Sequence, residues 1–338
     1  MPSLGTTFGR GGATTAQQDL SNADAILIMG SSMAENHPVG FQWVMEARAK
    51  GATIIHVDPR FTRTSAMAQV WAPIRAGSDI AFLGGIINYV LSKGKDFREY
   101  VVNYTNAPVI LRDDLKLPDD LDGVFSGWDP ETDKYSPETW LYKGEKMKTP
   151  SMSSTGTEEE AGGHGKRGGE AGDARPRELD YTLQHPNCVY QVLKRHFARY
   201  TPELVEELTG CPQEAFLKVC ETLVNASGPE RTAAVCYAVG WTHHSTGAQI
   251  IRTAAILQLL LGNVGRPGGG VMALRGHASI QGSTDIPTLY DILPGYLQMP
   301  IWNEAGRTFD AYMKKHTSET GVWSNYPGYF VSLMKAWY

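Results

Sequence analysis

Polar and glycine-containing segments follow four apolar runs of this sequence. These segments are Gly30–Asn36, Asp58–Arg60, Arg75–Asp79 and Gly240–Ser245. The first precedes a predicted helix, and the unpaired N–H groups at a helix start favour phosphate. Asp58 follows that loop by a few tens of residues, where a carboxylate accepts hydrogen bonds from ribose hydroxyls. Asp79 is a candidate acceptor for the N–H edge of guanine.

Both carboxylates also have a structural alternative. Asp58 can cap a turn before Pro59, and Asp79, next to Ser78, can be a helix N-cap. The first loop lacks the GxGxxG pattern of Rossmann dinucleotide sites, which disfavours an ordinary NAD site and an NAD-dependent dehydrogenase. These residue types therefore favour a nucleotide other than NAD.

Arg275 lies in the glycine-rich stretch "GGGVMALRGHASIQGSTD", and it is the residue there with the clearest chemical demand. A guanidinium is not deprotonated in proteins, so a buried one requires an anion. That anion is either an internal carboxylate such as Asp285 or an anionic ligand. The pair His243 and His244 follows another apolar run, and nothing nearby completes a set of metal ligands.

The elements that would position these segments follow from the hydrophobic pattern. Residues 24–58 predict a β-α-β unit: strand "ADAILIMG", loop "SSMAENHP", helix "VGFQWVMEARAKG" and strand "ATIIHVDPR". A further helix is expected over 77–94, with Ser78 and Asp79 as cap candidates and Gly94 at its end. Because the carboxyl ends of parallel strands share one edge of a sheet, we expect the four segments to meet in one crevice.

The second half of the chain continues this pattern. It predicts an ordered segment at 188–200, helices within 201–210 and 211–227, a strand within 232–240, the loop "WTHHSTG" and an internal helix within 248–265. Thr201 is the expected N-cap of one helix, and Pro202 and Pro212 are expected at first helical positions. The segment Ser151–Glu178 is rich in glycine and charge and is expected to be a solvated loop or flexible insertion.

The predicted fold class is therefore α/β, with a doubly wound and mostly parallel sheet. Residues 1–277 are expected to form this domain, interrupted by the insertion at 151–178. Residues 278–338, which are rich in aromatic side chains and show short helical patches, are expected to form part of a second α/β domain.

Composition excludes several classes of protein. The 338 residues carry a formal net charge of −5, which gives no basic surface for nucleic acid. None of the four cysteines belongs to a CxxC pair, which argues against a zinc or iron–sulfur site built from this chain alone and favours buried thiols. No apolar run has the length of a membrane span, and the first residues do not resemble an export signal.

Several motifs in order resemble the molybdopterin oxidoreductase family. They are "NADAILIMGSSMAENHPVGFQWVMEARAKGATIIHVDPRFTRTSAMA", "RAGSDIAFLGG", "YAVGWTHHSTGAQIIRTAAILQLLLGNVGRPGGGV" and "ALRGHASIQGSTD". The motifs "FGRGG", "VDPRFTRT", "TLQHP", "RYTP", "FLKVCE" and "LPGYL" resemble more narrowly the catalytic (alpha) subunits of respiratory, nitrate-inducible-type formate dehydrogenases. The resemblance runs from Pro2 to Tyr338, apart from Ser151–Glu178.

This resemblance implies a molybdenum or tungsten ion held by two molybdopterin guanine dinucleotides near a [4Fe–4S] cluster, and oxidation of formate to CO2. It implies that Arg275 holds the formate carboxylate by charge-assisted hydrogen bonds and orients its C–H bond toward the metal's sulfur ligands. The cofactor-binding residues that it implies are Gly30, Ser32, Glu35, Asn36, Asp58, Arg60, Gly77, Asp79, Gly240, Thr242 and His243. No residue of this chain is an expected metal ligand.

The chain departs from the family pattern at several points. It has Ser32 where the family carries Asn, and His243 where Gln is common. The family's metal ligand, a selenocysteine or cysteine followed by His, precedes the stretch that matches "PSLGTTFGRG". The family's N-terminal cysteine cluster and C-terminal cap domain have no match here either. We therefore expect a fragment of a larger subunit, which a UGA selenocysteine codon taken as a stop, a gene fragment or a pseudogene would each explain.

The resemblance thus predicts the central part of a formate dehydrogenase catalytic subunit. Its partners are expected to be an iron–sulfur electron-transfer subunit and a membrane cytochrome b subunit, with the full enzyme periplasmic or membrane-associated. The isolated chain is expected to turn over little or no formate. The alternative is a non-catalytic scaffold that keeps the fold without the metal, although Arg275 and "VDPR" argue against it.

Overall fold

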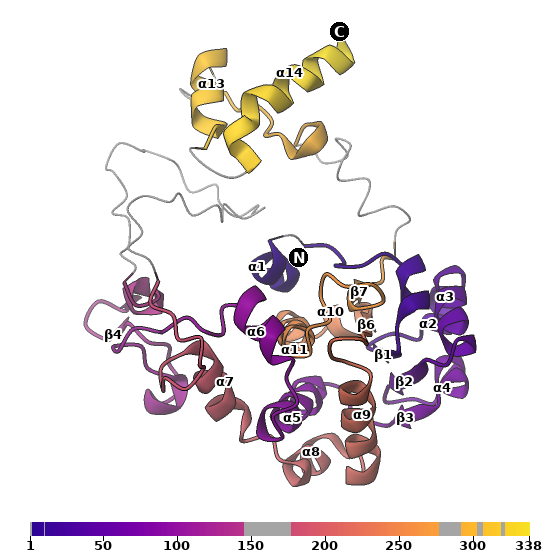
Figure 1. Cartoon of the computed structure of the whole chain (residues 1–338). Coiled ribbons are helices and arrows are strands. Elements are labelled where there is room, and N and C mark those ends of the chain that lie inside the picture. Colours follow the sequence, from indigo (N-terminus) through magenta and orange to yellow (C-terminus); the bar gives the residue numbers. More distant parts are fainter. Residues whose placement is uncertain (1, 10, 145–176, 277–291, 303–306, 319–321) are drawn as a thin grey trace. The chain divides into compact units, whose positions relative to one another are not determined.

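The computed structural model describes residues 2–9, 11–144, 177–276, 292–302, 307–318 and 322–338 (Figure 1). These residues fall into two compact units. The larger unit ends at Leu274, and the smaller unit takes in the described residues from Arg275 onward. The domain boundary predicted after residue 277 lies outside the described residues and stays a prediction.

A five-stranded parallel sheet forms the centre of the larger unit, in the order β3-β2-β1-β6-β7 (Figure 1). The strands are β1 (Ala25–Met29), β2 (Thr53–Val57), β3 (Val70–Ala72), β6 (Ala233–Tyr237) and β7 (Gly270–Ala273). All five strands run in the same direction, so their carboxyl ends share one edge, here called the carboxyl edge. The opposite edge, where the strands begin, is called the amino edge.

Helices cover both faces of this sheet. They are α1 (Pro2–Phe8), α2 (Met33–Asn36), α3 (Pro38–Ala49), α4 (Arg63–Met67), α5 (Asp79–Ser92), α6 (Arg98–Tyr104), α7 (Val189–Phe197), α8 (Pro202–Thr209), α9 (Gln213–Asn225), α10 (Val239–Thr242) and α11 (Gly247–Leu260), with a short 3-10 turn at Gln18–Asn22. Alternate residues of the strands belong to two separate hydrophobic clusters, one shared with α3 and the other with α5, α9 and α11. The sheet is therefore doubly wound, which confirms the predicted fold class.

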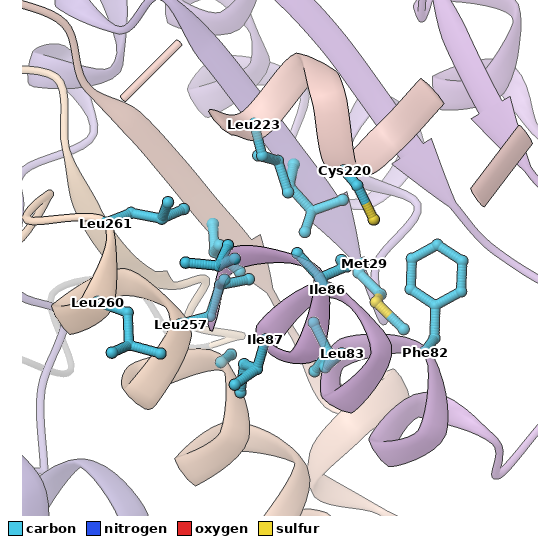
Figure 2. Packing of buried hydrophobic residues seen from close by; sticks show 14 of the residues in the cluster. Met29, Phe82, Leu83, Ile86, Ile87, Cys220, Leu223, Leu257, Leu260 and Leu261 are labelled. Atoms are coloured by element: carbon cyan, nitrogen blue, oxygen red, sulfur yellow. The ribbon is translucent and has the colours of Figure 1, made fainter. Parts of the chain in front are cut away.

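The larger cluster shows why these helices are nearly apolar. Figure 2 shows Met29 of β1 among Phe82 and Ile86 of α5, Cys220 of α9 and Leu257 of α11, all of which are fully buried. A helix between the sheet and a further helix layer has little solvent-facing surface. The all-round apolar pattern expected to place residues 248–265 inside the molecule is thereby confirmed.

Several elements differ from the prediction. The strands β3 and β7 were not expected, and the loop expected after β1 contains the short helix α2. The strand predicted within 232–240 ends at Tyr237, and the short helix α10 begins at Val239 and continues into the predicted loop. A four-residue helix has no period to detect, because its pattern covers barely one turn. Pro212 is the N-cap of α9 rather than its first residue, whereas Thr201 accepts the predicted capping bond from Leu204 N at 3.3 Å.

A peripheral segment separates the two halves of the sheet in sequence. It holds the hairpin β4 (Trp128–Asp129) and β5 (Lys134–Tyr135), and 3-10 turns at Pro118–Asp120 and Pro137–Trp140. Most of the predicted insertion lies outside the described residues. Its last residue, Glu178, is exposed and lies outside the helices and strands, and its carbonyl accepts a hydrogen bond from Ile110 N at 2.9 Å.

The described part of the smaller unit is helical. It contains 3-10 turns at Pro294–Tyr296 and Val322–Asn325, and the helices α13 (Phe309–His316) and α14 (Tyr326–Trp337). Tyr312 and Tyr326 are buried together and their hydroxyls are 2.7 Å apart. The second α/β domain expected for 278–338 stays a prediction. Within the described ranges of the whole chain, no helix combines the length and apolar character that a membrane crossing requires.

Candidate cofactor-binding site

The carboxyl edge contains a topological switch point between β1 and β6. From β1 the chain proceeds to β2 and β3 on one side, and β6 proceeds to β7 on the other. Loops that diverge at such a point leave room for a ligand beyond the strand ends. Here the two loops are tied at their base, because Gly30 O accepts hydrogen bonds from Gly240 N at 3.0 Å and from Ala238 N at 3.3 Å.

Glycine is required on both sides of this tie. Gly30 has φ +72°, and a Cβ atom there would lie 2.5 Å from Cδ1 of Trp241. A Cβ atom on Gly240 would lie 2.5 Å from the carbonyl oxygen of Gly30. Side chains at either position would push the two loops apart, since real Cβ atoms do not approach other atoms this closely. The two predicted residues Gly30 and Gly240 are thus brought together.

Trp241 connects the same tie to Asp79. Its ring is fully buried, stacks on Tyr237 at 5.0 Å between ring centroids, and donates from Nε1 to Asp79 Oδ1 at 3.0 Å. Asp79 is the first residue of α5 and is itself buried. Burial raises the pKa of its carboxyl group, an effect opposed by hydrogen bonds, including the one from Trp241, and by the charge of His244.

The predicted caps of α5 are only partly correct. Ser78 occupies the N-cap position, but its hydroxyl donates to Arg75 O at 2.6 Å and makes no capping bond to the helix. Asp79 is a helical residue and not the N-cap. Its Oδ1 atom is engaged by Trp241, so the expected contact of this carboxylate with guanine stays a prediction.

The predicted residues of the first loop bond to one another and to α4, where Ser32 Oγ lies 3.4 Å from Thr64 Oγ1. Ser32 Oγ donates to Glu35 Oε2 at 2.7 Å, and Asn36 Nδ2 donates to Ser32 O at 3.1 Å. Glu35 and Asn36 are exposed, whereas Ser32 is buried. Beside them, Ser31 Oγ is buried without a hydrogen-bond partner among the described residues, which is unusual for a hydroxyl group.

Asp58 begins the second loop. Its Oδ1 atom accepts from Arg60 N at 2.8 Å across Pro59, so the turn-capping alternative is confirmed. This bond leaves Oδ2, which lies 3.8 Å from Nε2 of the buried His56. The Asp58 side chain is 13% exposed, so a ligand can reach it, and Arg60 is exposed.

Gly77, Thr242 and His243 also lie in the connecting segments at this edge. Gly77 forms an exposed turn with φ +85°, and Thr242 and His243 are exposed at the C-terminal end of α10. Arg275 is half-buried and follows β7 by two residues, at the start of the smaller unit. The carboxyl edge therefore collects predicted residues from the loops that follow β1, β2, β3 and β6.

Three residues of this edge were not predicted: Ser31, His56 and Trp241. His56 had a detectable signal, because it is the only polar residue between Ile54 and Val57 of an apolar strand. Trp241 follows Gly240 as a large apolar residue in a segment otherwise predicted to be polar. Ser31 had no such signal, because its burial depends on the fold.

Cysteines play no part in this site. Cys188, Cys211, Cys220 and Cys236 are buried and free, as expected, and burial raises the pKa of the Cys211 thiol to about 11 and that of Cys236 to about 12. Within the described part of the chain, no three His, Cys, Asp or Glu side chains form a group that could hold a metal ion.

A protein-family model matches most of the chain. The family model described as "Molybdopterin oxidoreductase" matches residues 4–327. The chain belongs to the molybdopterin oxidoreductase family. This finding confirms the family resemblance that the sequence motifs carried.

Members of this family that are similar to the chain include formate dehydrogenase subunits. Over 343 aligned residues it is 46% identical to the "Formate dehydrogenase, nitrate-inducible, major subunit" and to the "Formate dehydrogenase-O major subunit", both of Escherichia coli K12. It is 40% identical to the "Formate dehydrogenase 2 subunit alpha (cytochrome c-553)" of Nitratidesulfovibrio vulgaris. Each alignment covers 99% of this chain, which spans only 31%, 31% and 30% of these relatives.

The similarity to a solved structure is weaker. The acetylene hydratase of Pelobacter acetylenicus aligns with a TM-score of 0.44 and 17% identity, over 77% of this chain and 25% of that one. A similarity of this size carries no argument about function.

Proposed function

We propose that this chain is the central part of the catalytic subunit of a formate dehydrogenase. The observation that carries the proposal is the 46% identity to two formate dehydrogenase major subunits over 99% of the chain. The reaction would convert formate to CO2, one proton and two electrons. A molybdenum or tungsten ion held by two molybdopterin guanine dinucleotides would accept the two electrons.

The residues of the carboxyl edge fit the nucleotide part of such a cofactor. The tie between Gly30 and Gly240 brings the starts of two loops together, and Gly240 is exposed there, so a phosphate can approach its backbone. The unpartnered hydroxyl of Ser31 lies beside it. Asp58 keeps Oδ2 available for ribose hydroxyls, and the exposed Arg60 supplies positive charge.

Arg275 would act on the substrate. Its guanidinium offers paired N–H donors that match a carboxylate, so it would hold formate by two charge-assisted hydrogen bonds. Fixing the carboxylate also fixes the direction of the C–H bond, which has to point toward the electron acceptor for the reaction to occur. The electrons would then pass to an iron–sulfur subunit and a membrane cytochrome b subunit. A [4Fe–4S] cluster near the metal would carry the electrons toward these partner subunits.

A chimera tests this proposal in a complete enzyme. The chain replaces the matching 31% of the nitrate-inducible Escherichia coli subunit, and formate-dependent dye reduction is measured together with pterin and GMP content. We expect the chimera to oxidise formate. Arg275→Ala should raise KM for formate by about 100-fold, since a charge-assisted bidentate contact contributes roughly 3 kcal/mol. The KM of the Arg275→Lys variant should lie between those of the unsubstituted chimera and of Arg275→Ala.

The control is Arg252→Ala. Arg252 is an exposed arginine of α11 whose NH2 donates to Thr6 Oγ1 at 2.8 Å, so its loss should leave KM unchanged. A loaded chimera whose Arg275→Ala variant keeps the wild-type KM would contradict the role of Arg275. A folded chimera that contains neither pterin nor GMP would instead favour a non-catalytic scaffold.

A further inference from the structure

His56 is a fully buried imidazole in a strand that is otherwise apolar. It lies next to Ile28 of β1 in the strand register, and its side chain has 0% exposure. A buried polar ring costs free energy unless its nitrogen atoms are hydrogen-bonded. In this case both nitrogens have partners: Nδ1 is 2.8 Å from Ser65 Oγ, and Nε2 is 3.2 Å from Ser31 O.

The direction of these bonds follows from their partners. A carbonyl oxygen can only accept, so Nε2 must carry the hydrogen and donate to Ser31 O. Nδ1 of a neutral ring then accepts from the hydroxyl of Ser65. That hydroxyl oxygen in turn accepts from Thr62 N at 2.9 Å. Burial lowers the pKa of His56, and the charge of Asp58 opposes this shift without reversing it, which agrees with a neutral ring.

This one ring joins two segments of the carboxyl edge by hydrogen bonds, the Ser31 loop and α4. Ser31 directly follows Gly30, whose carbonyl ties the β1 loop to the β6 loop. Ser65 belongs to α4, which follows the β2 loop. Asp58 lies in that loop with Oδ2 3.8 Å from His56 Nε2, and its Oδ1 accepts from Arg60 N. The Ser31 loop and the start of α4 are therefore held by a residue that no solvent or ligand touches.

We propose that His56 is a positioning residue, which holds the Ser31 loop through Ser31 O and the start of α4 through Ser65, in the arrangement that receives the guanosine diphosphate portion of the cofactor. The inference rests on the proposed function, because it assumes that this edge binds the nucleotide. His56 acts only through Ser31 and Ser65, since its own ring is fully buried.

Two amide substitutions separate positioning from simple packing. In His56→Gln, the side-chain NH2 group reaches the place of Nε2 and can still donate to Ser31 O, but the acceptor for Ser65 is lost. In His56→Asn, the side-chain oxygen takes the place of Nδ1 and can accept from Ser65, but the donor to Ser31 is lost. Each variant keeps one of two buried bonds, so their unfolding midpoints should fall by similar amounts. His56→Phe removes both bonds.

The experiment measures the affinity of the 338-residue chain for GDP by calorimetry, below the unfolding transition of every variant. We expect His56→Gln to bind GDP within about threefold of wild type, and His56→Asn and His56→Phe to bind about tenfold more weakly. Amide hydrogen exchange should accelerate in residues 31–36 of the Asn and Phe variants, and not in α9. Gln258→Leu is the matched control, because it disturbs a buried polar side chain at the amino edge.

The outcomes separate this inference from the proposed function. If the folded wild-type chain does not bind GDP, the nucleotide site fails, and the positioning role fails with it. If the wild type binds GDP and all three His56 variants bind equally well, only the positioning role is overturned. The positioning role is also overturned if the Asn and Gln variants lose affinity equally, in parallel with their stability, since that result indicates packing alone.

Discussion

The two edges of the central sheet use buried polar residues in opposite ways. At the amino edge, Gln258 Nε2 donates to Ala233 O at 2.9 Å and to Gly270 O at 2.6 Å, and Gln258 Oε1 accepts from Asn263 Nδ2 at 2.8 Å. Asn263 Oδ1 accepts from Ala233 N at 3.2 Å, which closes the set. These two side chains therefore bond only to other parts of the chain.

The carboxyl edge is not closed in this way. Ser31 Oγ has no hydrogen-bond partner among the described residues, Asp58 Oδ2 is 3.8 Å from its nearest cation-forming group, and Arg60 is exposed. Buried polar groups that bond internally stabilise a fold, whereas the carboxyl edge combines a buried unpartnered hydroxyl with partly exposed charged groups that a ligand can contact. Burial of a polar residue therefore does not by itself identify a site, because both edges bury polar residues.

The largest effect that would sharpen this comparison is expected for Gly30→Ala. The new methyl group would meet Trp241 at 2.5 Å in a backbone conformation with φ +72°, so we expect a loss of about 3 kcal/mol from strain and clash together. Urea unfolding measures it. The control is Gly265→Ala, which has φ +80° but open space around it and should cost only about 1–2 kcal/mol. Equal losses of unfolding free energy in the two variants would show that the contact with Trp241 adds nothing to the backbone strain.

A smaller loss is expected from Gln258→Leu at the amino edge. The substitution strips hydrogen bonds from Ala233 O and Gly270 O, so the free energy of unfolding should fall by about 2 kcal/mol. The affinity of the folded chain for GDP should not change, because the carboxyl edge is left intact. Weaker GDP binding at a temperature where the variant is fully folded would remove the distinction between the edges.

The smallest effect is expected for Asp79→Asn, and it depends on pH. Burial raises the pKa of Asp79 in the folded chain, so the folded state binds more protons than the unfolded state in the window just above the ordinary carboxyl pKa. The stability contributed by this group is present at low pH and decreases as pH rises through that window. The amide of the variant does not ionise, and its oxygen can still accept from Trp241.

We therefore expect the variant to gain stability relative to wild type between pH 4 and pH 7, by less than about 1 kcal/mol. Urea unfolding at the two pH values measures this difference. Asp79→Ala is the control, because it removes the acceptor of the Trp241 N–H group and should be less stable than wild type at both values. A relative loss on raising the pH would mean that the folded chain favours the charged carboxylate.

The sequence predicted the first half of the sheet well, because β1, α3 and β2 are consecutive and have the lengths and patterns of a βαβ unit. It missed β3 and β7 for a physical reason. These are the two edge strands, with three and four residues, and neither contains a polar side chain, so they show no alternation of polar and apolar residues. Their identity comes from pairing with β2 and β6.

The site was predicted as a set of loops, and its internal bonding was not. Gly30, Asp58 and Asp79 lie at the predicted edge, since parallel strands dictate where their loops go. The bond from Trp241 to Asp79 joins residues 162 positions apart, and no local pattern encodes such a pairing. His56 shows the intermediate case, because its position in an apolar strand was visible while the role of its two ring nitrogens depended on Ser31 and Ser65.

The strand order has a consequence for how the chain is made. Thr232, at the start of β6, bonds to Asp24, 208 residues earlier, and β6 pairs along one side of β1. At a synthesis rate of about 5–20 residues per second, β1 waits roughly 10–40 s for this partner. During that time one side of β1 is an unpaired apolar strand edge, which is prone to aggregation. The tie between Gly30 and Gly240 therefore forms late in biosynthesis, and a chaperone that shields β1 on the ribosome would raise the yield of folded protein.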